Sequence, residues 1–94
     1  MNKIEAKGII KNKINEFREK PYSELIEMID SEPVVYEIEA RSGALYQIEF
    51  QSFWDDKPND DVRVIGSIDN GKWSAFKPLS EDFIKNSENE FMGE

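Results

Sequence analysis

The sequence predicts one α+β domain, in which an N-terminal helical segment packs on a four-stranded antiparallel β-meander and a short helix follows. In the first part of the 94-residue chain, apolar side chains recur at helical spacing. Through the middle they alternate with polar side chains, and turn-forming residues separate the alternating runs. We therefore expect helical structure over residues 2–30, the β-meander over 33–79, and a short helix with a tail over 80–94.

The first helix is predicted over residues 2–19 because one apolar stripe runs along it. The stripe consists of Ala6, Ile10, Ile14 and Phe17. Pro21 disfavours helical geometry at the residue before it, so the helix is expected to end or kink there. A short second helix is expected over residues 22–30, and the Asp-Ser-Glu-Pro run at 30–33 ends it.

Two strands, over residues 33–40 and 44–54, form the first predicted hairpin. A three-residue loop with Gly43 in the left-handed region brings apolar residues opposite one another on one face. It pairs Ala40 with Ala44, Ile38 with Tyr46, Tyr36 with Ile48, and Val34 with Phe50. A two-residue loop would shift the register by one and set Glu39 against Tyr46, so the three-residue loop is favoured. Trp54 then points inward and Phe53 outward.

The Asn70-Gly71 pair predicts a tight turn between a strand over residues 62–69 and a last strand that ends at Pro78-Leu79. A two-residue turn pairs Asp69 with Lys72, Ile68 with Trp73, Gly66 with Ala75, and Ile65 with Phe76. In this register Trp73 lies across Gly66, which has no side chain of its own. A three-residue loop is the alternative, and it would exchange the two faces of the last strand.

A short C-terminal helix is expected over residues 81–86, with Ser80 as its N-cap. Two acidic residues in the first turn favour this helix, because they face its partial positive charge. Phe83 and Ile84 would be its apolar contacts, and residues 87–94 are expected to form a mobile or loosely docked tail.

The net charge of −8 is unevenly distributed along the chain. Residues 1–30 carry six basic and six acidic side chains, whereas residues 31–94 carry six and fourteen. Nucleic-acid binding depends on clustered Lys and Arg, so it is not expected. The acidic excess indicates a basic protein partner, or serves only solubility.

The expected location is the cytoplasm. No apolar run approaches the length of a membrane span, and the N-terminal residues lack the continuous apolar core of a signal peptide. The chain has no cysteine, so nothing favours an oxidising compartment. No membrane partner is expected, and a homodimer through an exposed strand edge or sheet patch is a second partner hypothesis.

The chain has neither histidine nor cysteine, which are the commonest general base, nucleophile and transition-metal ligands. We therefore predict no catalytic residue, no metal ligand and no cofactor, and we expect the protein not to be an enzyme. The run WDDKPNDD at 54–61 is the one loop that could hold a hard cation or a catalytic carboxylate. Its spacing does not fit an EF-hand, because Lys57 and Pro58 occupy ligand positions.

The outward face of the predicted sheet carries an apolar patch with an acidic rim, a pattern typical of protein-binding surfaces. The candidate partner-binding residues are Phe53, Trp54, Asp55, Asp56, Asp60, Asp61, Ile65 and Phe76. The alternative is that the C-terminal segment folds back and covers the patch. The favoured function is a non-enzymatic protein-interaction module, for instance an immunity- or inhibitor-like protein. The alternative function is a small carboxylate enzyme, or a ligand- or calcium-binding domain, that uses the loop at 54–61.

The run WDDKP…VRVIGSIDNGKWSAFKPLSEDFIK, from Trp54 to Lys85, resembles small bacterial proteins. This resemblance covers roughly the C-terminal half of the chain and implies a compact α+β domain of bacterial type. It implies no activity.

Overall fold

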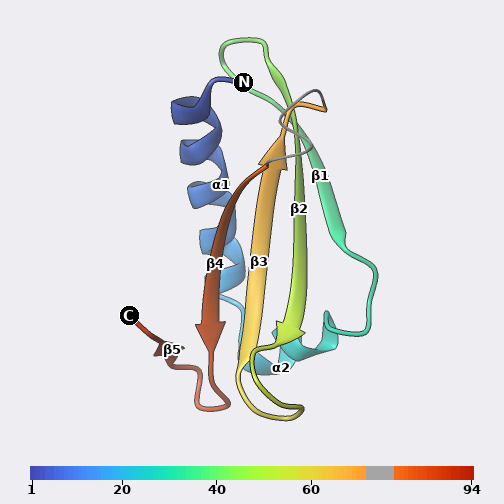
Figure 1. Ribbon diagram of the computed structural model, residues 1–94, viewed down its shortest axis with the longest axis vertical. Helices are drawn as coiled ribbons and strands as arrows, with labels where there is room; N and C mark the ends of the chain where they lie inside the picture. The colour runs from blue at the N-terminus through green and yellow to red at the C-terminus, as the bar shows by residue number, and fades with distance from the viewer. Residues whose placement is uncertain (72–77) are drawn as a thin grey trace.

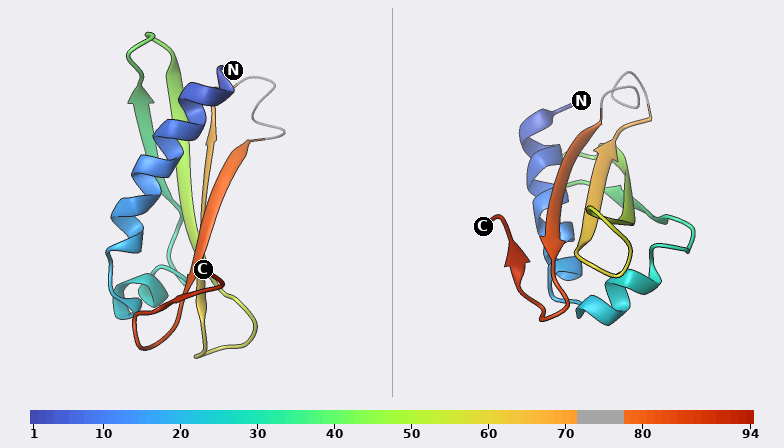
Figure 2. Two further views of the ribbon diagram at one scale, coloured as in Figure 1. Left: turned by 90° about the vertical axis from the view of Figure 1, so that its left-hand side faces the viewer. Right: turned by 60° about the horizontal axis from the view of Figure 1, so that its bottom comes forward.

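A layer of two helices covers one face of a five-stranded antiparallel sheet in the computed structural model, which describes residues 1–71 and 78–94 (Figure 1). The elements are α1 (Lys3–Arg18), α2 (Tyr22–Glu27), β1 (Val34–Glu39), β2 (Leu45–Trp54), β3 (Val62–Asp69), β4 (Leu79–Lys85) and β5 (Phe91–Met92). The strands follow one another in the order β1-β2-β3-β4-β5. Figure 2 shows α1 running along one side of the sheet, with α2 at its end on the same side.

The prediction for α1 is confirmed. Its first turn is capped by Asn2, whose side chain accepts a hydrogen bond of 3.1 Å from the main-chain N–H of Glu5. The predicted apolar stripe is the buried face of the helix. The helix ends at Arg18, just before Pro21, where proline geometry predicted an end. Among the described residues, no helix combines the length and the apolar character needed to cross a membrane.

The predicted register of the first hairpin is also confirmed. Val34 lies opposite Phe50, Tyr36 opposite Ile48, and Ile38 opposite Tyr46. The main-chain N–H of Ala40 donates to the carbonyl oxygen of Ala44 at 2.8 Å, and Gly43 takes the left-handed conformation with φ of 88°. The inward-facing residues of β2 thus join the core beneath α1.

The predicted short helix over 81–86 is wrong, because residues 79–85 form strand β4. Ser80 and the acids that follow it have the local chemistry of a helix start, but Phe83 and Lys85 alternate with exposed or half-buried residues. Pairing with β3 satisfies the main-chain groups along the second edge of β3 and buries Phe83 in the core. The hydrogen bonds between β4 and β3 therefore outweigh the tendency of Ser80 to start a helix.

The predicted partners of β3 are also wrong. Ile68, Gly66 and Ile65 lie opposite Leu79, Glu81 and Asp82, respectively. The residues that the two-residue turn would have paired with β3, which are Lys72, Trp73, Ala75 and Phe76, lie outside the described residues. The tail contributes a fifth strand that the sequence did not predict, since Met92 and Phe91 pair with Ile84 and Lys85.

Gly66 provides the space for the central aromatic contact of the core. Phe50 lies directly opposite Gly66, and a Cβ on Gly66 would come within 2.8 Å of Phe50 Cδ1. The other side of the Phe50 ring stacks on Phe17 of α1, with ring centroids 4.1 Å apart. Phe50, which was also predicted to lie in the core, therefore covers Gly66. The predicted contact of Gly66 with Trp73 involves a residue outside the described ranges.

Candidate functional site

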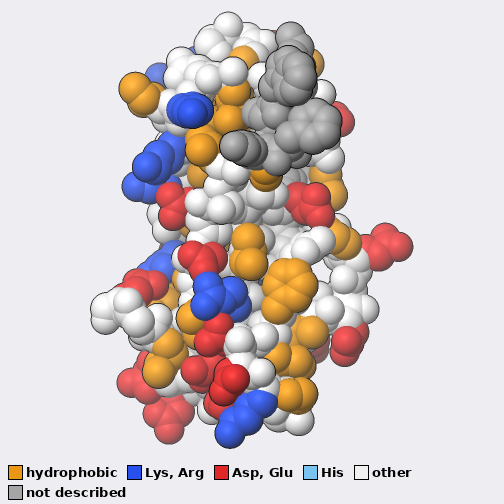
Figure 3. Space-filling view, in the orientation of Figure 1, with side chains coloured by type: hydrophobic (Ala, Val, Ile, Leu, Met, Phe, Trp, Pro, Cys, Tyr) orange, Lys and Arg blue, Asp and Glu red, His pale blue; other side chains and the backbone are white. Residues whose placement is uncertain are grey.

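The face of the sheet opposite α1, called the outer face below, carries no helix among the described residues. Figure 3 looks onto this face and shows hydrophobic, acidic and basic side chains side by side over the strands. Strand alternation places on it Val35, Glu37, Glu39, Leu45, Gln47, Glu49, Gln51, Phe53, Arg63, Ile65, Ser67, Asp69, Ser80, Asp82 and Ile84. The fold thus leaves the outer face without a covering helix among the described residues.

Phe53 and Ile65 form the apolar centre of the outer face. Phe53 is 45% exposed, and with Ile65 it lines a shallow depression of ≈ 240 Å³. Glu49, Gln51 and Ser67 complete its lining. The third predicted member of this patch, Phe76, lies outside the described residues. The described C-terminal segment does not cover the depression, because Phe83 is buried beneath the sheet and Phe91 packs against it.

Elsewhere on the outer face lie two well-exposed apolar residues that were not among the predicted binding candidates. Leu45 is 69% exposed and Val35 is 50% exposed, and both lie on the outer face. The alternation that placed their neighbours inside was sufficient to place them outside.

Arg63 lies between two carboxylates on the outer face. Its Nε donates to Asp55 Oδ1 at 2.9 Å, and its Nη1 donates to Asp82. The hydrogen bond that Arg63 donates to Asp55 is the main reason why the pKa of Arg63 is raised. Arg63 is the one basic side chain that the described strands place on this face, and its charge is already balanced. The remaining carboxylates of the face therefore dominate its potential.

The acidic loop between β2 and β3 is an exposed hairpin connection. The main-chain N–H of Asp55 donates to the carbonyl oxygen of Asp61 at 2.9 Å, which closes the loop. Asp56 and Asp60 are exposed, and Trp54 is half-buried at the end of β2. Burial, and then repulsion from the neighbouring carboxylates, raises the pKa of Asp61.

The loop carboxylates do not converge on a common point. Across residues 1–71 and 78–94, no three acidic side chains gather closely enough to hold a metal ion. The structure brings Asp55 to Arg63 and leaves Asp56 and Asp60 in solvent. The sequence-predicted site residues thus divide into the apolar pair Phe53 and Ile65 and a loop beside it.

A second open surface lies on the helix side of β1. Because α1 packs on β3 and β4, the inward side chains of β1, which are Val34, Tyr36 and Ile38, are only half-buried. Two hollows of ≈ 560 Å³ and ≈ 340 Å³ lie along this strand, and we call them together the β1 groove. Lys13 on α1 lies over this strand, with Nζ 4.1 Å from the Tyr36 ring centroid. The sequence assigned this apolar row to the core.

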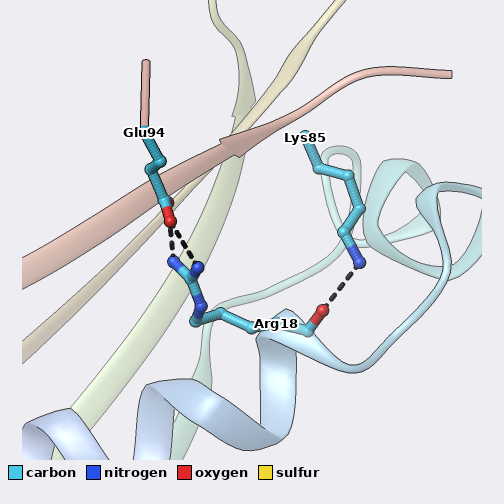
Figure 4. A network of polar contacts seen from close by, with 3 residues as sticks. All are labelled: Arg18, Lys85 and Glu94. Atoms are coloured by element: carbon cyan, nitrogen blue, oxygen red, sulfur yellow. Dashed lines mark hydrogen bonds and ion pairs between the residues drawn. The ribbon is translucent and has the colours of Figure 1, made fainter. Parts of the chain in front are cut away.

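A polar cluster at the end of α1 holds the C-terminal strands in place (Figure 4). Lys85 is 4% exposed, and its Nζ donates to the carbonyl oxygens of Arg18 and Lys20 at 2.6 and 2.8 Å. Burial, and secondarily the charge of Arg18, lowers the pKa of Lys85. Arg18 donates twice to Glu94, at 2.8 and 2.6 Å, and lies 4.0 Å from the Phe91 ring centroid. These contacts are structural, because every described polar partner of Lys85 is a main-chain carbonyl of the helix end.

Comparison with known proteins returns no match for this chain. No protein-family model matches it, and neither the curated proteins nor the solved structures contain a significant match. The outer face and the β1 groove are therefore the features of the described structure that point to a function.

Proposed function

We propose that this protein is a non-enzymatic interaction module of bacterial type that binds a basic protein through the outer face of its sheet. An immunity- or inhibitor-like protein that neutralises a basic partner is one concrete form. The proposal includes a cytoplasmic location, with which a chain that has no cysteine is compatible.

The observation that carries the proposal is the charge of the uncovered outer face. Its acidic residues are Glu37, Glu39, Glu49, Asp69 and Asp82. The only basic residue of the described strands on this face, Arg63, is already paired with Asp55 and Asp82. Such a surface attracts a basic partner and repels an acidic one.

The apolar centre of the same face supports the proposal independently of charge. Phe53 and Ile65 line a depression, and polar or acidic side chains surround it. An apolar centre within a polar rim is the usual arrangement of a protein-binding surface, and a buried aromatic side chain often supplies much of the binding energy. The acidic rim would bring the partner to the face, and Phe53 would anchor it.

The alternative function is a carboxylate enzyme, or a ligand- or calcium-binding domain, that uses the loop at 54–61. The raised pKa of Asp61 favours it, because acid–base chemistry needs such a shift. Against it, Asp55 is held by Arg63, and Asp56 and Asp60 point into solvent. Calcium at millimolar concentration separates the calcium-binding form: a rise in melting temperature would support it, and an unchanged temperature would reject it.

Affinity capture from the source cells with matched variants tests the proposed function. Phe53→Ser and Glu49→Lys alter the outer face. The controls Ile4→Ser and Glu19→Lys make an apolar-to-serine change and the same charge reversal at exposed positions of the helical segment. We expect the first pair to lose a basic protein that the wild type and the second pair retain. Equal recovery by all four variants, or recovery of no protein at all, would reject the proposal.

A further inference from the structure

Strand β1 has an unpaired edge within the described part of the chain. It lies at the end of the strand order, and its described strand partner is β2. The hydrogen bond from Ala40 N–H to Ala44 fixes which main-chain groups point toward β2, because such groups alternate along an antiparallel strand. Ile38, Tyr36 and Val34 therefore bond to β2. The main-chain N–H and C=O groups of Val35, Glu37 and Glu39 point away from the sheet.

This edge lacks the usual features that prevent strand pairing. β1 contains no lysine and no internal proline, and its register with β2 runs without a bulge over all six residues. Its only protective feature is acidic, since Glu37 and Glu39 flank the unpaired groups. A second copy of β1 paired symmetrically about Glu37 would set this carboxylate against itself, which is unfavourable. A basic strand meets no such repulsion.

The β1 groove lies beside the same edge, so a strand that binds there needs apolar side chains on its helix side. Val34, Tyr36 and Ile38 are half-buried on the helix side, and the hollows of ≈ 560 and ≈ 340 Å³ lie beside them. A further strand would lie about 4.8 Å from β1, with alternate side chains on the two faces of the sheet. Its helix-side residues would cover this apolar row, and its outer-face residues would lie beside the glutamates.

We propose that β1 is the docking edge for one extended segment of the basic partner, which joins the sheet as an additional strand. The segment alternates Lys or Arg with apolar residues, so that its cations lie beside Glu37 and Glu39 and its apolar residues cover the β1 groove. Main-chain hydrogen bonds supply affinity and the alternating side chains supply specificity, as in other cases of strand addition. This inference rests on the proposed function and specifies the part of the partner that is recognised.

The test uses a synthetic peptide, Lys-Ile-Lys-Val-Lys-Ile-Lys, with capped ends, titrated into the full-length ¹⁵N-labelled protein. We expect the amide protons of Val35, Glu37 and Glu39 to shift and to become protected from solvent exchange. Two control peptides are Lys-Lys-Ile-Val-Ile-Lys-Lys, which has the same composition without alternation, and Glu-Ile-Glu-Val-Glu-Ile-Glu. Both should bind at least tenfold more weakly, because one loses the alternation and the other reverses the charge.

Glu37→Pro is the sharpest variant. It removes the outward N–H of residue 37 and leaves the donors of Tyr36 and Ile38 that serve β2. We expect about tenfold weaker binding of the lysine peptide. If this variant does not fold, the double variant Glu37→Lys with Glu39→Lys still decides the question, since it should now prefer the glutamate peptide. Glu19→Lys, on the helical side, should bind as the wild type does.

Several results would overturn the inference. One is that the edge variants bind the lysine peptide as tightly as the wild type does. Another is that the non-alternating peptide binds as tightly as the alternating one. Amide shifts confined to Phe53 and Ile65 would place the peptide elsewhere on the sheet. A dimer of the free protein that Glu37→Pro dissociates would show that the occupant of the edge is a second copy.

Partner capture separates this inference from the proposed function. If the partner is lost in Phe53→Ser but retained in Glu37→Pro, docking at the β1 edge is rejected and the proposed function stands. If both variants retain the partner, both proposals are rejected.

Discussion

Lys85 Nζ lies 2.6 Å from the main-chain carbonyl oxygen of Arg18, so a side chain from β4 caps the C-terminal end of α1. The last carbonyl groups of a helix have no partner within it, and they carry partial negative charge. Lys85 also donates to the carbonyl of Lys20, and is nearly fully buried in doing so. One ammonium group thus links the strand to the helix and satisfies two main-chain acceptors.

Lys85→Met should destabilise the protein by about 2 kcal/mol, because these partly buried carbonyl groups lose their charged donor. Urea unfolding of the purified protein measures the change. Lys11→Met serves as the control, since Lys11 is exposed on α1 and its replacement should alter the free energy of unfolding by less than about 0.5 kcal/mol. Equal effects of the two substitutions would show that the cap contributes nothing.

The ion pair of Arg18 and Glu94 should make a pH-dependent contribution to stability. The hydrogen bonds from Arg18 lower the pKa of Glu94 below its ordinary value of 4.5. Because the folded state holds this carboxylate ionised, the contribution is complete above pH 4.5 and is lost as the pH falls through the lowered value. The difference in unfolding free energy between the wild type and Glu94→Gln should therefore disappear in acid. Glu88→Gln, at an exposed turn position, should show no such difference, and a Glu94→Gln difference that persists in acid would contradict the ion pair.

Two glycine substitutions should act in opposite directions. Gly66→Ala should destabilise by about 1–3 kcal/mol, because the new methyl group would collide with the Phe50 ring stacked on Phe17. Gly8→Ala should stabilise by about 1 kcal/mol, since Gly8 lies within α1 with open space where a Cβ would be. Thermal or urea unfolding measures both, and a neutral Gly66→Ala would show that Phe50 can move aside.

Ser52 is the one buried hydroxyl in the described residues without a hydrogen-bond partner. Ser52→Ala removes an unsatisfied polar atom from the core face of β2, so it should stabilise by about 1 kcal/mol. Ser67→Ala, on the outer face, should have little effect on the same measurement. A loss of stability in Ser52→Ala would indicate that the hydroxyl is hydrogen-bonded in solution.

Much of this fold follows from local patterns in the chain. The buried stripe of α1, the helix end before Pro21 and the register set by Gly43 all depend on neighbours within a few residues. The outward position of Phe53 and Ile65 follows from the same alternation. These features could be predicted because a helix or hairpin expresses its periodicity directly in the sequence.

Local patterns are therefore sufficient to predict the class of fold, the first hairpin and the apolar centre of the outer face. Tertiary pairing decided that residues 79–85 form a strand, because the open edge of β3 supplies hydrogen bonds that outweigh the helix-capping signal at Ser80. It also decided that Phe50 covers Gly66, since that contact depends on the position of Phe17 above it. The exposed edge of β1 has the same origin: α1 packs over β3 and β4, so the first strand keeps an apolar row that no local pattern distinguishes from core.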